Sequence, residues 1–114
     1  MTEAMEQQKA QASAWFRTLR DEIVAAFEAL EDRQVADLPA GRFEVNETTR
    51  TSDDGSDAGG GLMSVMRGGR VFEKVGVNIS TVYGQLGDAA QKAMAARGIP
   101  GMESDPRFWA TGIS

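Results

Sequence analysis

Residues 71–80 read VFEKVGVNIS, and this stretch decides how the sheet is organised. Its alternation predicts a long strand over about residues 70–83, with successive side chains on opposite faces. Glu73 interrupts an otherwise apolar face, where a carboxylate must be paired, hydrogen-bonded or at an edge. The other face carries Asn78 and Ser80 beside Gly76, which leaves room for a close approach. Two interpretations stay open: an ordinary sheet with one wet face, or a face that meets a ligand or a second subunit.

The segments on either side predict further strands. LMSVM indicates a short strand over about 62–67, and RGG at 67–69 is a turn, so the two strands form an antiparallel hairpin. Upstream, the period of two in RFEVNETTRT predicts a strand over about 42–51. The remaining predictions are a loop over 52–61, a helix over about 88–97 and a strand over about 108–114.

A long helix is predicted at the N-terminus, over about residues 3–31, because this range contains neither Gly nor Pro. Its apolar residues recur at spacings of three and four, which favours a helix that covers a sheet; a partner-binding helix is the alternative. The stripe consists of Ala12, Phe16 with Trp15, Leu19, Ile23, Phe27 with Ala26, and Leu30. The polar face between comprises Arg17, Arg20, Asp21, Glu28 and Glu31.

Together these elements predict an α+β fold, a mainly antiparallel sheet flanked by helices, with residues 1–114 as one unit. The net charge of −5 argues against nucleic-acid binding, which needs clustered Lys and Arg. The sequence has no Cys and no His, so it offers neither a thiolate nor an imidazole. No secretory signal is visible, and no apolar run reaches the roughly 18 residues that span a bilayer. We therefore expect a cytoplasmic protein.

Two familiar loop patterns are absent. The glycines of AGGGLMSVMRGG are not followed by the Lys-Ser/Thr and helix of a phosphate loop. The acidic run at 52–57 lacks the final Glu of a calcium loop, since that position is Ser64. Arg67 and Arg70 bracket a glycine pair, and their guanidinium groups suit a carboxylate or phosphate. They are the candidate anion-binding residues of the chain.

The stretch GGGLMSVMRGGRVFEKVGVNISTVYGQL, residues 59–86, followed by FWATGIS, resembles the N-terminal third of oxygen-dependent coproporphyrinogen-III oxidases. The resemblance implies oxidative decarboxylation of two propionates of coproporphyrinogen III, giving protoporphyrinogen IX in haem and porphyrin biosynthesis. It also implies molecular oxygen as oxidant, no organic cofactor, an open question over a divalent metal, and a homodimer. We therefore expect a tetrapyrrole substrate and an N-terminal piece of something longer.

The resemblance assigns few site residues to this chain. Ser114 matches the serine that contacts substrate in that family, whereas Arg67 and Arg70 are at most accessory. The family's histidines and catalytic aspartate lie further along, so we expect no catalytic residue or metal ligand here and no turnover by these 114 residues alone. The strand entering VFEK resembles the one associated with dimer contacts, which assigns Val65, Met66, Val71, Phe72, Glu73 and Lys74 to a dimer interface.

Three hypotheses follow. The first is an N-terminal part of the enzyme that carries one wall of the substrate cleft. The second is a non-catalytic binding or dimerisation module with the same sheet. The third is an unrelated anion-binding protein that uses Arg67, Arg70 and the glycines.

Overall fold

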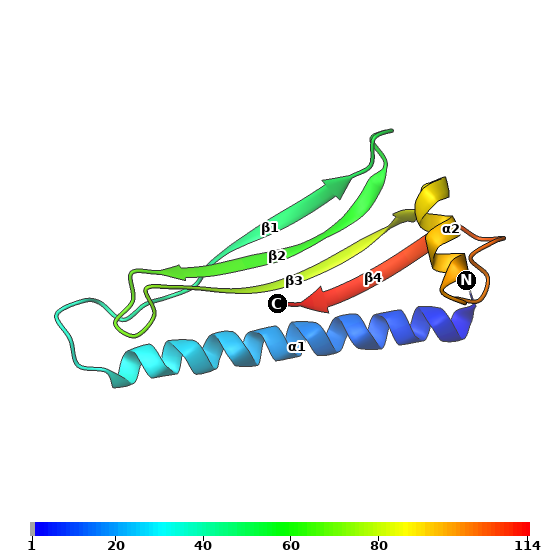
Figure 1. Cartoon of the computed structure of the whole chain (residues 1–114). Coiled ribbons are helices and arrows are strands. Elements are labelled where there is room, and N and C mark those ends of the chain that lie inside the picture. Colours follow the sequence, from blue (N-terminus) through cyan, green and yellow to red (C-terminus); the bar gives the residue numbers. More distant parts are fainter. Residues whose placement is uncertain (1) are drawn as a thin grey trace.

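The computed structural model describes residues 2–114 and confirms the α+β fold, with a four-stranded antiparallel sheet in the order β1-β2-β3-β4. A long helix runs along the sheet, and a short one joins the last two strands (Figure 1). The described residues extend over 60 × 29 × 26 Å. The elements are α1 (Glu3–Arg33), β1 (Glu44–Thr51), β2 (Asp57–Arg67), β3 (Lys74–Gln85), α2 (Asp88–Ala96) and β4 (Arg107–Ile113).

Helix α1 begins where its first turn can be capped. The Thr2 hydroxyl accepts a hydrogen bond from Met5 N at 3.2 Å, and acidic residues in the first turn complement the helix dipole. Most of the predicted stripe is half-buried against the sheet, including Phe16, Leu19 and Phe27. Trp15 and Leu30 differ, being 53% and 38% exposed. The covering helix is therefore confirmed, with a narrower apolar face than the spacing predicted.

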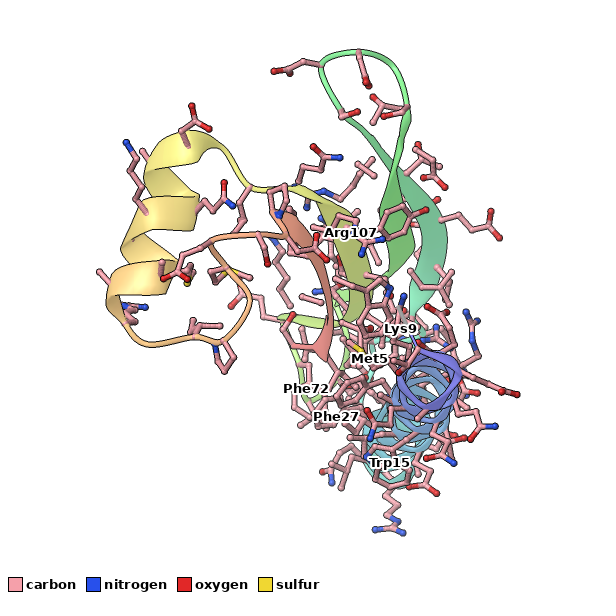
Figure 2. The ribbon with its side chains drawn as sticks, turned by 90° about the vertical axis from the view of Figure 1, so that its right-hand side faces the viewer. Met5, Lys9, Trp15, Phe27, Phe72 and Arg107 are labelled. Atoms are coloured by element: carbon pink, nitrogen blue, oxygen red, sulfur yellow. The ribbon has the colours of Figure 1, made fainter. Side chains whose placement is uncertain are left out.

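The core lies between α1 and the two central strands. Its buried apolar side chains are Met66 of β2 and Val77 and Ile79 of β3, which are 0%, 3% and 9% exposed. Phe27 of α1 packs on Phe72 with ring centroids 4.9 Å apart (Figure 2). Neither helix covers the opposite face of the sheet within residues 2–114, and that face stays open (Figure 1).

Met66→Ala is expected to destabilise the chain by about 2–5 kcal/mol, the range for truncating a buried Met. Met66 is fully buried and packs beside Gly41, so little can collapse into the space it leaves. Urea unfolding followed by circular dichroism measures the loss. Met63→Ala in the same strand is the matched control, because Met63 is 45% exposed. Equal losses for the two variants would contradict this placement of the core.

The strand predicted over residues 70–83 was predicted to start too early in the chain. β3 starts at Lys74, and the chain before it forms a turn closed by Gly68 N–H to Glu73 O at 2.8 Å and Gly69 N–H to Phe72 O at 2.9 Å. Glu73 is exposed at this turn and does not interrupt an apolar face. From Lys74 onward the predicted alternation holds, with Val77 and Ile79 buried.

The start of β2 was also predicted wrongly, because the glycines at 59–61 belong to this strand and not to a loop. A Cβ on Gly59 would lie 2.0 Å from Thr81 O, and one on Gly61 would lie 2.0 Å from Ile79 O. A Cβ on Gly60 would meet Thr48 O of β1 at 2.3 Å. The glycines thus allow β1 and β3 to approach β2 from both sides. The other predicted boundaries fall within three residues of those observed.

Candidate functional site

Ser114, the substrate-contacting residue implied by the resemblance, directly follows β4 and is paired with β3. Its N–H donates to Asn78 O at 2.9 Å, and Asn78 N–H donates to Ser114 O at 2.7 Å. This reciprocal pair continues the β3–β4 ladder by one residue beyond Ile79 and Ile113. Ser114 is exposed, and Figure 1 places this end of the chain near the middle of α1's length.

A shallow hollow of about 280 Å³ surrounds this pair. Asn78 and Ser80 contribute an amide and a hydroxyl, and Gly112 contributes no side chain. The surface can therefore offer neutral hydrogen-bond donors to a broad ligand that lies across the two strands. The lining residues are Asn78, Ser80, Val82, Ala110, Thr111, Gly112, Ile113 and Ser114.

A polar network lies between α1 and β2 and reaches the hollow only through Asn78. Ser64 of β2 is 0% exposed, and its hydroxyl accepts hydrogen bonds from Arg20 Nη2 at 2.8 Å and Arg20 Nε at 3.2 Å. Ser64 N–H donates to Asn78 Oδ1 at 3.2 Å. Arg20 was predicted on the outer polar face of the helix, yet its side chain is only 12% exposed. The sequence signal was the single hydroxyl within the apolar run LMSVM, which marks a position that needs a buried partner.

A second polar centre holds the β2–β3 turn against the end of α1. Glu31 was also predicted on the outer face, but it is 0% exposed. Its Oε1 accepts N–H bonds from Gly41 at 2.8 Å and Arg70 at 2.5 Å, and its Oε2 accepts from Val71 at 2.6 Å and Phe72 at 2.9 Å. Burial raises the pKa of this carboxyl, but the four N–H donors outweigh burial and lower its pKa from 4.5 to about 2.

Arg67 and Arg70 do not join Ser114 in one site. Arg70 caps the end of α1, since its Nε donates to Leu38 O at 2.7 Å and its Nη1 donates to Gln34 O at 2.8 Å. Arg67 is exposed at the end of β2 and lines a separate hollow of about 270 Å³ with Arg42 and Glu44. Their ligand role stays a prediction, and Arg70 has a structural role that the sequence did not indicate.

The six residues predicted for a dimer interface lie in different environments. Met66 is fully buried in the core of this chain, so its side chain has no surface to offer a second subunit. Phe72 packs on Phe27, whereas Val71 is 45% exposed. Glu73 and Lys74 are exposed, and Val65 is half-buried on the open face. The dimer role of this group stays a prediction.

A larger hollow of about 790 Å³ lies elsewhere, beside the 52–57 loop, and contains none of the predicted site residues. Tyr83 OH donates to Asp57 there, which lowers the pKa of Asp57. Lys9 Nζ lies 5.2 Å from the centre of the Trp109 ring, and Figure 2 shows Lys9 near Met5 and Arg107.

Within residues 2–114, no group of three or more His, Cys, Asp or Glu could hold a metal ion. None of the helices described for this chain is long and apolar enough to cross a membrane.

The fold and the hollow define a class of polypeptide: a helix-backed antiparallel sheet with a polar hollow on its open face. The sequence profile described as Coproporphyrinogen III oxidase matches residues 11–114, and this chain belongs to that family. No solved structure matched the chain at a significant level.

Curated relatives from Rickettsia species carry the name oxygen-dependent coproporphyrinogen-III oxidase. The protein from Rickettsia bellii (strain RML369-C) is 48% identical over 104 residues, which cover 90% of this chain and 33% of the relative. The protein from Rickettsia felis is 45% identical over 105 residues, covering 90% and 34%. The chain thus spans about a third of the length of the curated relatives that it matches.

Proposed function

We propose that this chain forms one wall of the substrate site of an oxygen-dependent coproporphyrinogen-III oxidase. The observation that carries the proposal is the placement of Ser114 in a polar hollow on an open sheet face, in a chain of this family. The rest of the site would come from the part of the relatives that this chain does not match. The proposal includes a homodimer in the cytoplasm, acting in haem and porphyrin biosynthesis.

The reaction explains what this wall would contribute. Each of two propionates of coproporphyrinogen III would lose CO₂, a proton and two electrons to become a vinyl group. Molecular oxygen would accept the electrons, together with protons, without an organic cofactor. The wall's task is to bind and orient the substrate. The chain's net charge of −5 does not attract an anion with four carboxylates, so the contacts from this wall would be neutral hydrogen bonds.

The open face suits a tetrapyrrole in shape as well. Gly76 and Gly112 have no side chains to hold a broad ligand away from the sheet, and Asn78, Ser80 and Ser114 supply polar groups around them. The proposal assigns only substrate binding to this chain, and the sequence offers neither an imidazole nor a thiolate for proton transfer.

Coproporphyrin III, the stable oxidised form of the substrate, serves as the ligand in the test. Ser114→Ala is expected to weaken its binding by roughly tenfold, because this is the usual effect of losing one hydrogen bond to a charged group. Fluorescence titration measures the affinity for the chain. Ser104→Ala is the matched control, because Ser104 is exposed and outside the hollow. An unchanged affinity for Ser114→Ala, or no binding by the unaltered chain, would refute the proposed wall. Measurable oxygen-dependent turnover by these 114 residues would refute the proposal that this chain only binds the substrate.

A further inference from the structure

We propose that Asn78 is a second substrate-contacting residue, whose side-chain Nδ2 donates a hydrogen bond to a propionate carboxylate beside Ser114. The inference rests on the proposed function and adds the residue that would fix the position of one carboxylate. No feature of the strand alternation singles out Asn78 for this role, because any small polar residue would satisfy the pattern.

The orientation of the Asn78 amide follows from its surroundings. Ser64 N–H can only donate, so the oxygen of the Asn78 amide must face it, and Oδ1 does so at 3.2 Å. The nitrogen then has to point the other way. Among the hydrogen bonds within residues 2–114, none is donated by Nδ2. Asn78 therefore presents a donor that lacks an acceptor within the described chain.

Nδ2 lies on the open face of the sheet beside Gly76, at the edge of the hollow. Asn78 lines it together with Ser80 and Ser114. Nδ2 is 3.5 Å from the position that a Cβ on Gly76 would occupy, so the glycine leaves the approach to this donor uncovered. The reciprocal backbone bonds between Asn78 and Ser114 put the two residues directly opposite each other. An amide donor and a hydroxyl side by side match the two oxygens of a carboxylate.

The network behind Asn78 makes this orientation rigid. Ser64 is completely buried, and two guanidinium nitrogens of Arg20 hold its hydroxyl from the α1 side of the sheet. Rotating the Asn78 amide by half a turn would set Nδ2 against Ser64 N–H, donor against donor. A donor that needs no reorientation loses little conformational entropy when the ligand binds. Asn78 thus combines a fixed amide with an open approach.

The decisive variant is Asn78→Asp, which keeps an acceptor for Ser64 N–H and replaces the donor with an anionic oxygen. We expect its affinity for coproporphyrin III to fall by more than tenfold in the fluorescence titration, since the carboxylates repel each other. The matched control is Asn46→Asp, which adds the same charge to an exposed residue of β1 on the same face of the sheet and should bind like the unaltered chain. Circular dichroism checks that both variants fold.

The unaltered chain gives a test that needs no variant. In ¹⁵N NMR spectra, the side-chain amide resonances of Asn78 should move when coproporphyrin III is added, while those of Asn46 stay in place. If Ser114→Ala weakens binding but Asn78→Asp does not, or the Asn78 amide does not respond, the proposed wall stands and the role of Asn78 is overturned. If the unaltered chain does not bind coproporphyrin III, the proposed function itself fails and the inference falls with it.

Discussion

Replacing Glu31 with Gln is expected to lower the melting temperature of the chain by on the order of 10 °C or more. The carboxylate accepts four backbone N–H bonds, two on each oxygen. The Gln amide can keep one pair, but its NH₂ group meets the other two N–H groups donor against donor. A buried N–H left without an acceptor costs about 1–3 kcal/mol, which makes this a large effect for a change of one atom. Thermal unfolding followed by circular dichroism measures it.

The same substitution should change how stability depends on pH. The folded-state pKa of Glu31 is about 2, below its ordinary 4.5, so this group stabilises the fold above pH 4.5 and its contribution disappears as the pH falls toward 2. The difference in melting temperature between the unaltered chain and Glu31→Gln should therefore shrink over this interval. Glu47→Gln is the control, because Glu47 is exposed in β1. A Glu31→Gln chain as stable as the Glu47→Gln chain at pH 7 would contradict the role of the buried carboxylate.

Replacing Gly59 with Ala is expected to destabilise the chain by about 3 kcal/mol or more, through overpacking and backbone strain together. The added Cβ would lie 2.0 Å from Thr81 O, so β2 and β3 would have to separate. The φ angle of Gly59 is +117°, which an L-residue rarely adopts. β2 is already irregular here, because its pairing with β1 shifts between Arg50 and Thr51. The midpoint of urea unfolding measures the loss.

Gly112→Ala is the matched control for that experiment. It is the same substitution in the same sheet, but a Cβ on Gly112 has open space around it and the residue has no positive φ angle. We expect a change of less than about 1 kcal/mol there, as for a surface substitution away from special features. Similar unfolding midpoints for the two variants would show that β2 and β3 do not need the close approach that Gly59 allows.

Most of the helices and strands were predicted from local sequence patterns, in which residues a few positions apart share one face. The apolar spacing over residues 3–31 placed α1, because a helix brings residues three and four apart onto one face. The alternation from Lys74 to Thr81 placed β3 and its buried face for the same kind of local reason. The glycine run misled the prediction of β2, since glycine ordinarily marks a loop and only the neighbouring strands explain its presence in this one.

The candidate site was also only partly predictable from the sequence. The polar alternation of Asn78 and Ser80 is visible in the sequence, and the resemblance pointed to Ser114. What brings Ser114 opposite Asn78 is the β3–β4 register, which pairs residues 36 positions apart along the chain, from 78 to 114. The partners of Arg20, Glu31 and Arg70 were likewise out of reach, because helical spacing cannot tell a solvated charge from one that faces backbone N–H or C=O groups of a distant turn.

The sequence by itself determined the α+β class, the helix and strand that carry the core, and the family to which the chain belongs. Only the tertiary structure decided that VFEK is mostly a turn and not the start of a strand. The physical reason is the buried carboxylate of Glu31 at the end of α1. It accepts hydrogen bonds from the backbone N–H groups of Val71 and Phe72, which in a strand would donate to a neighbouring strand. Local periodicity cannot anticipate such an acceptor, because it lies about 40 residues away in the chain.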